Sequence, residues 1–375
     1  MRKAQSAGGG ASSEAAQQLS ALLGRYEHHC LQTNSSPSAE LKLDILHHID
    51  TQQPLRKITL SVPELEPSDT LLPSLQPLLM AIRDERYTHV QEFHIWSLSF
   101  KQTDVVELCF LMERRGTTVY PFRLLELLDC RLSEWSMKRL GKALATSYLT
   151  TLCLDYTLVG QEGLKGLLSG GLGSGQICSL SLCYCGLGSW SGTLLASLLT
   201  NGPVRELYIN GNDLQCEGAI ELLRPVAENS QKLAEIQNST TSIKGKKTKK
   251  KSEKSKSGPD SSGGPRLEKL HMFDNSIDNS GTEGPSQLAQ FLELLCILVK
   301  FSSQLTELDL GENHIGEDGG KMISEALRER QAAKLPSIKI EVSTRMSTET
   351  FGAILTSGKE LKSGKKKRRA KGKMK

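Results

Sequence analysis

The chain has 375 residues, of which 38 % are hydrophobic and 5 % are aromatic, a balance that favours a repetitive leucine-packed core over a mixed one. Its formal net charge is +5, but residues 244–256 and 359–375 hold 18 of the 47 basic side chains and 2 of the 42 acidic ones, so the remaining chain is acidic by 11 charges. No segment reaches the roughly 18–20 consecutive apolar residues of a membrane-spanning helix, and the N-terminal residues lack the apolar stretch of a signal peptide. We therefore expect a protein of the cytoplasm or the nucleus.

Two different segments precede the first repeat. Residues 1–18 are low in complexity, which predicts a disordered N-terminus. Residues 19–54 have the apolar spacing of helices, with Leu22, Tyr26, Leu41 and Ile45 among the apolar positions. We interpret this segment as a helical N-terminal cap that covers the exposed core of the first repeat.

The chain carries an internal repeat, whose clearest copy is Leu207-Tyr-Ile-Asn-Gly-Asn-Asp-Leu214. The same pattern, LxLxxNxL, recurs at residues 270–277 and 308–315. Its alternating apolar residues send one face of a short strand into a core. The Asn side chain hydrogen-bonds to backbone groups where the strand ends, and later Gly and Leu residues begin and pack a returning helix.

Weaker copies keep this register through residues 55–230 and 266–358. The strand starts at residues 125, 152, 180 and 207 are separated by 27, 28 and 27 residues, which accommodates a strand and a full helix per repeat. Further strands are expected near residues 58 and 93 and, in degenerate form, near residue 338. The pattern predicts the fold class, an α/β leucine-rich-repeat solenoid: a horseshoe with parallel strands on its concave face, helices outside, and a C-terminal cap within residues 266–358.

Two lysine-rich segments interrupt or follow the repeats. The 63 residues between strand starts 207 and 270 leave room for one repeat and an insertion at residues 231–265. We predict that this insertion and the tail at residues 359–375 are disordered. Because neither contains an aromatic residue, we expect attraction to phosphate or carboxylate groups without base stacking. The alternative interpretation is that these segments only increase solubility. The candidate polyanion-binding residues are Lys246, Lys247, Lys249, Lys250, Lys251, Lys365, Lys366, Lys367, Arg368 and Arg369.

The strand register also selects the side chains of the concave face, because residues that alternate with the buried leucines point outward. Exposed aromatic side chains are typical anchors of a protein interface, and neighbouring carboxylates would form an acidic rim. The alternative interpretation is an ordinary solvated strand face. We predict that a protein partner binds through His94, Trp96, Asp155, Tyr208, Asn210, His271, Phe273 and Asp309.

The sequence has no motif typical of an enzyme, a metal site or a cofactor site. None of its nine cysteines falls in a paired CxxC zinc spacing. Cys130 and Cys185 stand at the Asn position of their repeats, where Cys is an accepted substitute. The adjacent histidine pairs at residues 28–29 and 47–48 would point in different directions on a helix. We therefore predict a protein that is not an enzyme and uses neither a metal nor a cofactor.

The repeat region as a whole resembles the ribonuclease-inhibitor-like family of intracellular leucine-rich-repeat proteins. The copies at residues 207–214, 270–277 and 308–315 carry this resemblance, which implies a role in protein binding. The family includes the Ran GTPase-activating protein and several axonemal proteins. The Ran activator usually carries an acidic tail, whereas this chain has a basic one, which counts against that function.

Over residues 55–345 the chain also resembles the family of the ciliary leucine-rich repeat-containing protein 71. One feature is the strand Leu55-Arg-Lys-Ile-Thr-Leu60, followed by a proline-interrupted helix and a strand bearing Trp96. The others are a charged helix that leads into the lysine-rich insertion and repeats that resume at Leu270 and Leu308. The resemblance implies a structural component of the axoneme. The short insertion and the long basic tail depart from that family.

These observations lead to one main hypothesis and two alternatives. The main hypothesis is a non-catalytic protein-binding scaffold of the motile-cilium or flagellar axoneme, whose lysine-rich segments contact acidic surfaces such as tubulin tails. The first alternative is a nuclear or nucleolar RNA-associated adaptor, since residues 365–369 have the basic density of a nuclear-localisation or nucleic-acid patch. The second is a regulator of a small GTPase.

Overall fold

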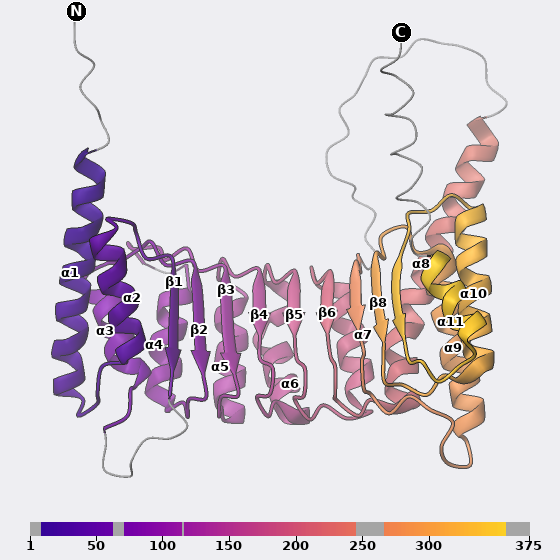
Figure 1. Ribbon diagram of the computed structural model, residues 1–375, viewed down its shortest axis with the longest axis horizontal. Coiled ribbons are helices and arrows are strands. Elements are labelled where there is room, and N and C mark those ends of the chain that lie inside the picture. The colour runs from indigo at the N-terminus through magenta and orange to yellow at the C-terminus, as the bar shows by residue number, and fades with distance from the viewer. Residues whose placement is uncertain (1–8, 63–70, 115, 245–265, 358–375) are drawn as a thin grey trace, which may run out of the picture. The chain divides into compact units, whose positions relative to one another are not determined.

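The computed structural model describes residues 9–62, 71–114, 116–244 and 266–357. These residues form two compact units, an N-terminal unit within Met1–Cys185 and a C-terminal unit within Gly186–Lys375. Both units repeat one motif, in which a short strand is followed by a turn and a helix (Figure 1). Within the described ranges, no helix combines the length and the apolar character needed to cross a membrane.

The N-terminal unit contains a parallel sheet in which each strand pairs with the next strand along the chain. The strands are β1 (Lys57–Ser61), β2 (Glu92–Trp96), β3 (Leu124–Leu128), β4 (Thr151–Cys153) and β5 (Ser179–Ser181). The helices are α1 (Gly9–Gln32), α2 (Ala39–Asp50), α3 (Leu75–Asp84), α4 (Gln102–Met112), α5 (Glu134–Leu144) and α6 (Gly160–Gly170), with a short 3-10 helix η1 (Leu172–Ser174). Figure 1 shows α3 to α6 behind the strands, so that the other face of the sheet, which we call the open strand face, is not covered by these helices.

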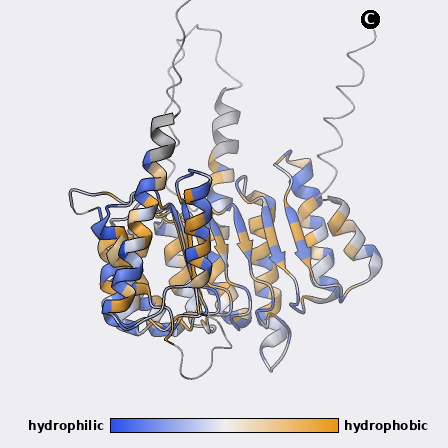
Figure 2. Ribbon diagram, turned by 60° about the vertical axis from the view of Figure 1, so that its left-hand side comes forward, coloured by the Kyte–Doolittle hydropathy of each residue, from blue (hydrophilic) through white to orange (hydrophobic). Residues whose placement is uncertain are grey.

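Apolar residues at the centre of each strand form the core of the N-terminal unit. Phe93, Leu125, Leu152 and Leu180 occupy equivalent positions in β2 to β5 and are each at most 1 % exposed. Burial alternates along β1, β3, β4 and β5, because successive side chains of a strand point to opposite faces. Figure 2 shows hydrophobic and hydrophilic residues interspersed along the strands. The strand register predicted from the leucine pattern is confirmed.

Helices α1 and α2 precede the first strand, as the predicted N-terminal cap requires. Helix α2 packs beside β1, and α1 packs beside both α2 and α3. The side chains of Leu22, Tyr26, Leu41 and Ile45 are buried. The backbone N–H of Ser38 donates to the Tyr26 hydroxyl at 3.0 Å, which fixes the connection between the two helices.

The predicted disordered N-terminus is too long. Helix α1 begins at Gly9, so residues 9–18 are helical rather than disordered. Ala15 and Leu19, four residues apart, are both buried and extend the apolar stripe of the helix toward its start. Residues 1–8 lie outside the described residues.

The C-terminal unit contains a second run of parallel strands in chain order. The strands are β6 (Glu206–Tyr208), β7 (Lys269–His271), β8 (Glu307–Leu310) and β9 (Lys339–Val342). The last of these confirms the degenerate strand expected near residue 338. The helices are α7 (Ser191–Asn201), α8 (Gln215–Lys244), α9 (Gly284–Phe301), α10 (Gly316–Ala332) and α11 (Thr348–Ser357).

Helix α8 corrects the predicted start of the lysine-rich insertion. It has 30 residues and ends at Lys244, so residues 231–244 are helical rather than disordered. The Gln, Lys, Leu, Ala and Glu residues at 231–235 are strong helix formers, which explains why the helix continues. Strands β6 and β7 nevertheless pair directly, with Leu207 opposite Leu270, as the repeat register predicts.

Three buried asparagines hold the strand-exit turns of the C-terminal unit. Asn212, Asn275 and Asn313 are at most 2 % exposed. Oδ1 of Asn275 accepts hydrogen bonds from the N–H groups of Asn212 and Leu214, both at 3.3 Å. Oδ1 of Asn313 accepts from the N–H groups of Asn275 and Ile277, at 3.0 and 3.2 Å. Each Nδ2 donates to a carbonyl at the end of its own strand. Oδ1 of Asn212 likewise accepts from the Leu187 N–H at 3.3 Å, so each of the three asparagines joins its turn to the turn that precedes it.

One arginine of α10 is buried in the same unit and joins three segments of the chain. Arg330 is 2 % exposed, and burial lowers the pKa of its guanidinium to about 10, which leaves it charged at neutral pH. Its guanidinium donates to four backbone carbonyls, those of Val299 (2.7 Å), Ser302 (2.6 Å), Leu305 (3.1 Å) and Pro336 (2.7 Å). These contacts satisfy carbonyls at the end of α9 that the helix itself leaves without donors.

Candidate protein-binding surface

The side chains predicted to bind a partner lie on the side of the strands that faces away from the buried core. We use the name open strand face for this surface in both units. These side chains alternate with the buried strand residues, and all but one are half-buried. Half-buried side chains keep some accessible area while neighbours restrict their conformations, a property of interface anchors. The N-terminal unit supplies His94, Trp96 and Asp155, and the C-terminal unit supplies Tyr208, Asn210, His271, Phe273 and Asp309.

In the N-terminal unit, His94 and Trp96 share the carboxylate of Glu126 on the neighbouring strand. Nε1 of Trp96 donates to Oε1 of Glu126 at 2.5 Å, and Nδ1 of His94 lies 3.1 Å from the same oxygen. Nε2 of His94 lies 3.5 Å from Glu92, but it is buried and makes no hydrogen bond. These neighbours leave His94 only 8 % exposed, so its predicted outward exposure is wrong, whereas Trp96 remains half-buried.

Asp155 ties two neighbouring strand ends of the N-terminal unit together. Its Oδ1 accepts a hydrogen bond from the Ser181 hydroxyl at 2.6 Å and another from the Cys183 N–H at 2.9 Å. The carboxylate therefore has an internal structural role, and a partner would meet an oxygen that is already held in place. The sequence pattern alone did not predict this contact.

In the C-terminal unit, an aromatic ring and a histidine lie among three carboxylates. The ring centroids of Tyr208 and His271 are 4.7 Å apart with an interplanar angle of 61°. The Tyr208 hydroxyl donates to Glu206 at 3.3 Å, and burial raises the pKa of this phenol. His271 lies 3.6 Å from Glu307 and 3.7 Å from Asp309. Both Tyr208 and Asp309, expected to be exposed, are half-buried by this packing.

A second aromatic side chain of this unit depends on the glycine of the next repeat. The Phe273 N–H donates to Oδ1 of Asn210 at 3.0 Å, so the Asn210 amide positions the following strand. The Phe273 ring lies 2.7 Å from the place where a Cβ of residue Gly311 would be. Gly311 therefore leaves the space that the ring occupies, and a larger residue would displace the ring.

The leucine pattern did not select two tyrosines at the strand-exit turns of the N-terminal unit. Tyr156 and Tyr184 have left-handed φ values of 58° and 55°, which are unfavourable for bulky residues. Their rings stack at 5.0 Å with an interplanar angle of 4°, and 57 % and 39 % of their areas are exposed. The signal that could have found them is their position, one residue before the Asn position of two consecutive repeats.

The candidate polyanion-binding lysines and arginines belong to the two lysine-rich segments. Residues 246–251 and 365–369 lie outside the described residues. Their predicted role stays a prediction.

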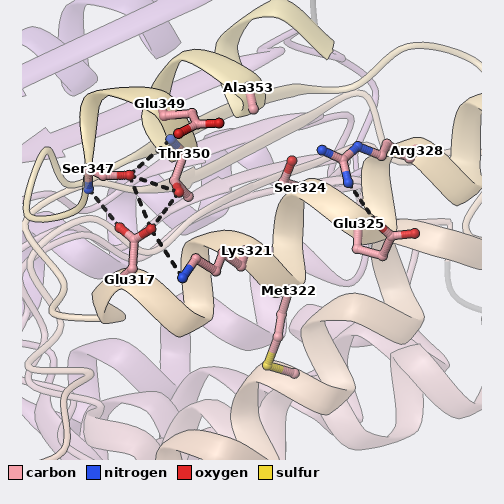
Figure 3. Close-up of a pocket in the computed structure, with 10 residues that line it drawn as sticks. All are labelled: Glu317, Lys321, Met322, Ser324, Glu325, Arg328, Ser347, Glu349, Thr350 and Ala353. Atoms are coloured by element: carbon pink, nitrogen blue, oxygen red, sulfur yellow. Dashed lines mark hydrogen bonds and ion pairs between the residues drawn. The ribbon is translucent and has the colours of Figure 1, made fainter.

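A groove of about 780 Å³ lies between α10 and α11 (Figure 3). Glu317 in its wall accepts hydrogen bonds from the Ser347 N–H and the Thr350 hydroxyl, both at 2.7 Å. These bonds lower the pKa of Glu317 to about 2. Two further lining residues, Arg328 and Glu325, form an ion pair of 2.8 Å. Glu317 therefore holds the first turn of α11, and we assign its carboxylate a structural role.

The cysteines near the strand face are poor nucleophiles. Burial raises the pKa of Cys130 to about 11 and that of Cys153 to about 12, and it also raises the pKa of Cys185. A protonated thiol is neither a good nucleophile nor a metal ligand. In the part of the chain that the structure describes, no three His, Cys, Asp or Glu side chains are grouped as metal ligands.

Comparison with known proteins supports the repeat assignment. A family model described as Leucine Rich repeat matches residues 302–324, which include β8, the Asn313 turn and the start of α10. Ribonuclease inhibitor from Sus scrofa is 29 % identical over 238 residues, which cover 56 % of this chain and 50 % of the relative. Ribonuclease inhibitor from Mus musculus is 27 % identical over 262 residues, covering 63 % and 56 %.

The chain contains leucine-rich repeats and is similar to ribonuclease inhibitors over slightly more than half of its length. It spans about half the length of the curated relatives it matches. The parallel strands, the helix after each strand and the asparagine turns of this leucine-rich-repeat protein agree with the assignment.

Proposed function

We propose that this leucine-rich-repeat protein is a non-catalytic scaffold whose open strand faces bind a protein partner. The observation that carries the proposal is the Tyr208–His271 cluster, in which rings and carboxylates are half-buried and already held by neighbours. Side chains fixed before binding lose little conformational freedom when a partner arrives. The Trp96 ring, whose Nε1 is bonded to Glu126, offers a second anchor of the same kind.

We further propose that the partner belongs to the axoneme of motile cilia or flagella. The support is the resemblance of residues 55–345 to a ciliary family, together with lysine-rich segments suited to acidic tubulin tails. The test is the location of a tagged full-length chain in multiciliated cells. We expect the tag along the axoneme. A nuclear or nucleolar location would replace this proposal with the RNA-associated adaptor, and enrichment at the nuclear envelope would favour a GTPase regulator.

The contribution of the strand face is tested by co-sedimentation of the purified chain with isolated axonemes. We expect Trp96→Ala and Tyr208→Ala to weaken binding by roughly tenfold, because interface aromatic anchors often contribute more than 1 kcal/mol. The matched control is Tyr148→Ala, which removes an exposed tyrosine that stacks on Arg114. Equal binding by all four proteins would contradict a role of the strand face.

The contribution of the lysine-rich segments is tested in the same assay at two salt concentrations. Deletion of residues 244–256 should lower axonemal binding most at low salt, because exposed charges are screened within about 8–10 Å at physiological ionic strength. Neutralising residues 365–369 should act in the same direction. If both changes leave axonemal binding intact and abolish nuclear entry or RNA retention, the nuclear adaptor is the better function.

The name of the two relatives suggests one more measurement. Ribonuclease inhibitors from pig and mouse match slightly more than half of this chain. Titration of a ribonuclease activity with the purified chain tests whether that partner is shared. Stoichiometric inhibition would move the proposal from an axonemal partner to a ribonuclease.

A further inference from the structure

Strand β9 has one paired side and one open side. It pairs with β8, and no other described strand of the sheet pairs with its second side. The Lys339 N–H donates to the Thr306 carbonyl at 2.8 Å, so Lys339 directs its backbone groups toward β8. Ile340, the next residue, directs its N–H and carbonyl toward the open edge, because successive residues of a strand alternate in this respect. An open strand edge is a template for pairing with another strand.

The side chains along this edge place opposite charges on the two sides of Ile340. Lys339 and Glu341 are 61 % and 52 % exposed, and Nζ of Lys339 lies 2.6 Å from Oε1 of Glu341 and 2.8 Å from Oε1 of Glu307 on β8. Ile338, Ile340 and Val342 are buried in the core. The side chains of residues 338–342 are therefore buried, positive, buried, negative and buried in turn. Two copies of this strand in antiparallel orientation would place a positive side chain opposite a negative one.

We propose that β9 pairs in antiparallel orientation with β9 of a second copy of this chain, with the two-fold axis at Ile340. In this register Ile340 exchanges two hydrogen bonds with its counterpart, and Ile338 pairs with Val342. Lys339 stands opposite Glu341 of the second copy, at a position without backbone hydrogen bonds, where Cα atoms are about 4.5 Å apart and side chains are closest. A two-fold interface repeats each contact, so two such ion pairs form.

The charges select this register among the neighbouring ones. An axis at Lys339 would place two lysines opposite each other, and an axis at Glu341 would place two glutamates opposite each other. Like charges directly opposite each other destabilise an antiparallel pair, whereas opposite charges stabilise it. A shift by one residue also moves core side chains to the open face. The inference goes beyond the proposed function, because it requires no protein other than the chain itself.

The experiment is sedimentation equilibrium of the full-length chain over about 1 to 300 µM, a range suited to a small interface. We expect the mean mass to rise from that of the 41.1 kDa chain toward twice that value. Lys339→Glu alone and Glu341→Lys alone should each weaken association by at least about tenfold, because both interchain pairs become repulsive.

The decisive sample is an equimolar mixture of these two single variants. In a mixed pair, the glutamate introduced in one variant would stand opposite the lysine introduced in the other, and the second contact would join the unchanged Lys339 and Glu341. Both contacts would then be attractive, so the mixture should associate about as strongly as the original chain. The matched controls are Lys165→Glu and Glu162→Lys, which change an exposed ion pair of α6 and should leave association unchanged. Melting temperatures identify any variant that fails to fold.

Three results would overturn the proposal. The original chain could remain at the mass of one copy throughout the concentration range. The two variants could associate as well as the original chain, which would place the contact elsewhere. Each variant could lose association without recovery in the mixture, which would mean that the substitutions act through the fold rather than through pairing between copies.

Discussion

The strand-exit turns of the two units share a backbone conformation but are filled by different side chains. The residue before the Asn position has a left-handed φ in both, 50° at Asp129 and 53° at Asp274. In the C-terminal unit an asparagine follows in three turns, whereas the N-terminal unit uses Leu98, Cys130, Thr157 and Cys185. The repeated backbone sets the geometry of the turn, and the side chain that fills it determines how many backbone groups find partners.

Asparagine and cysteine side chains at this turn position differ in the number and strength of the hydrogen bonds that they can make. An asparagine has two donors and a carbonyl acceptor, and Asn275 uses them on both sides of its turn. A thiol is a weak donor. Cys185 makes a close contact of this weaker kind, from its Sγ to the Leu154 carbonyl at 3.1 Å. We infer that side-chain hydrogen bonds contribute much of the stability of the strand-exit turns in the C-terminal unit. In the N-terminal unit the packing of the buried side chain contributes more to the stability of these turns.

The largest expected effect concerns the polar contacts of the C-terminal unit. Arg330→Met keeps an apolar side chain of similar length but removes all donors to four buried carbonyls. We expect the free energy of unfolding to fall by about 3–5 kcal/mol, because buried polar groups without partners are costly. Urea denaturation measures the loss. A loss below about 1 kcal/mol would mean that water replaces the guanidinium and that the comparison overstates these contacts.

The next effect compares one turn from each unit. Asn275→Leu should cost about 2–4 kcal/mol, because the N–H groups of Asn212 and Leu214 both lose their acceptor. Thr157→Val in the N-terminal unit should cost about 1–2 kcal/mol, because the Cys130 N–H loses its acceptor at 3.0 Å and the Leu127 carbonyl loses its donor at 2.8 Å. Chemical denaturation of both variants gives the two values. Equal losses would remove the distinction between the units.

A cysteine turn should be the more tolerant case. Cys185→Ala removes a buried sulfur whose role is mainly to fill space, and we expect a loss of about 1 kcal/mol from the resulting small cavity. The measurement is again the free energy of unfolding, with Asn313→Ala as the counterpart in the C-terminal unit. The prediction fails if the cysteine variant loses as much stability as the asparagine variant.

The smallest effect concerns the pH dependence of the α11 contact. The pKa of Glu317 is lowered to about 2 in the folded chain, from about 4.3 for an ordinary glutamate. Its contribution to stability is therefore complete above about pH 4.3 and is lost as the pH falls through about 2. Hydrogen exchange of the α11 amides should accelerate in that window relative to the rest of the unit. Glu317→Gln should abolish the additional acceleration.

The sequence predicts the strands well because their signal is local. Even β9 follows from Ile338 and Ile340, since alternation needs only a few residues. Helix boundaries are harder to predict, and α1 and α8 extend beyond their expected limits. In both cases good helix formers continue a helix through residues whose composition is typical of disorder.

The contacts around the candidate site could not be predicted from the sequence of a single strand. His94 is buried by Glu126, which is 32 residues away, and Phe273 is bonded to Asn210, which is 63 residues away. A single-strand pattern identifies which side chains point outward but not what the adjacent repeats place beside them. The stacking of Tyr156 on Tyr184 is a contact of the same kind.

The direct pairing of β6 with β7 has a consequence for how such a chain can change. Leu207 and Leu270 are partners although 63 residues separate them, about twice the usual repeat. The strand ladder and the asparagine contacts depend on residues near the strands and turns, not on the length of the return path from helix to strand. New sequence can therefore enter after a helix, by duplication or by design, without changing any pairing. A fluorescent domain inserted within residues 245–265 would use this freedom, whereas one extra residue between Leu207 and Asn212 would misplace the turn.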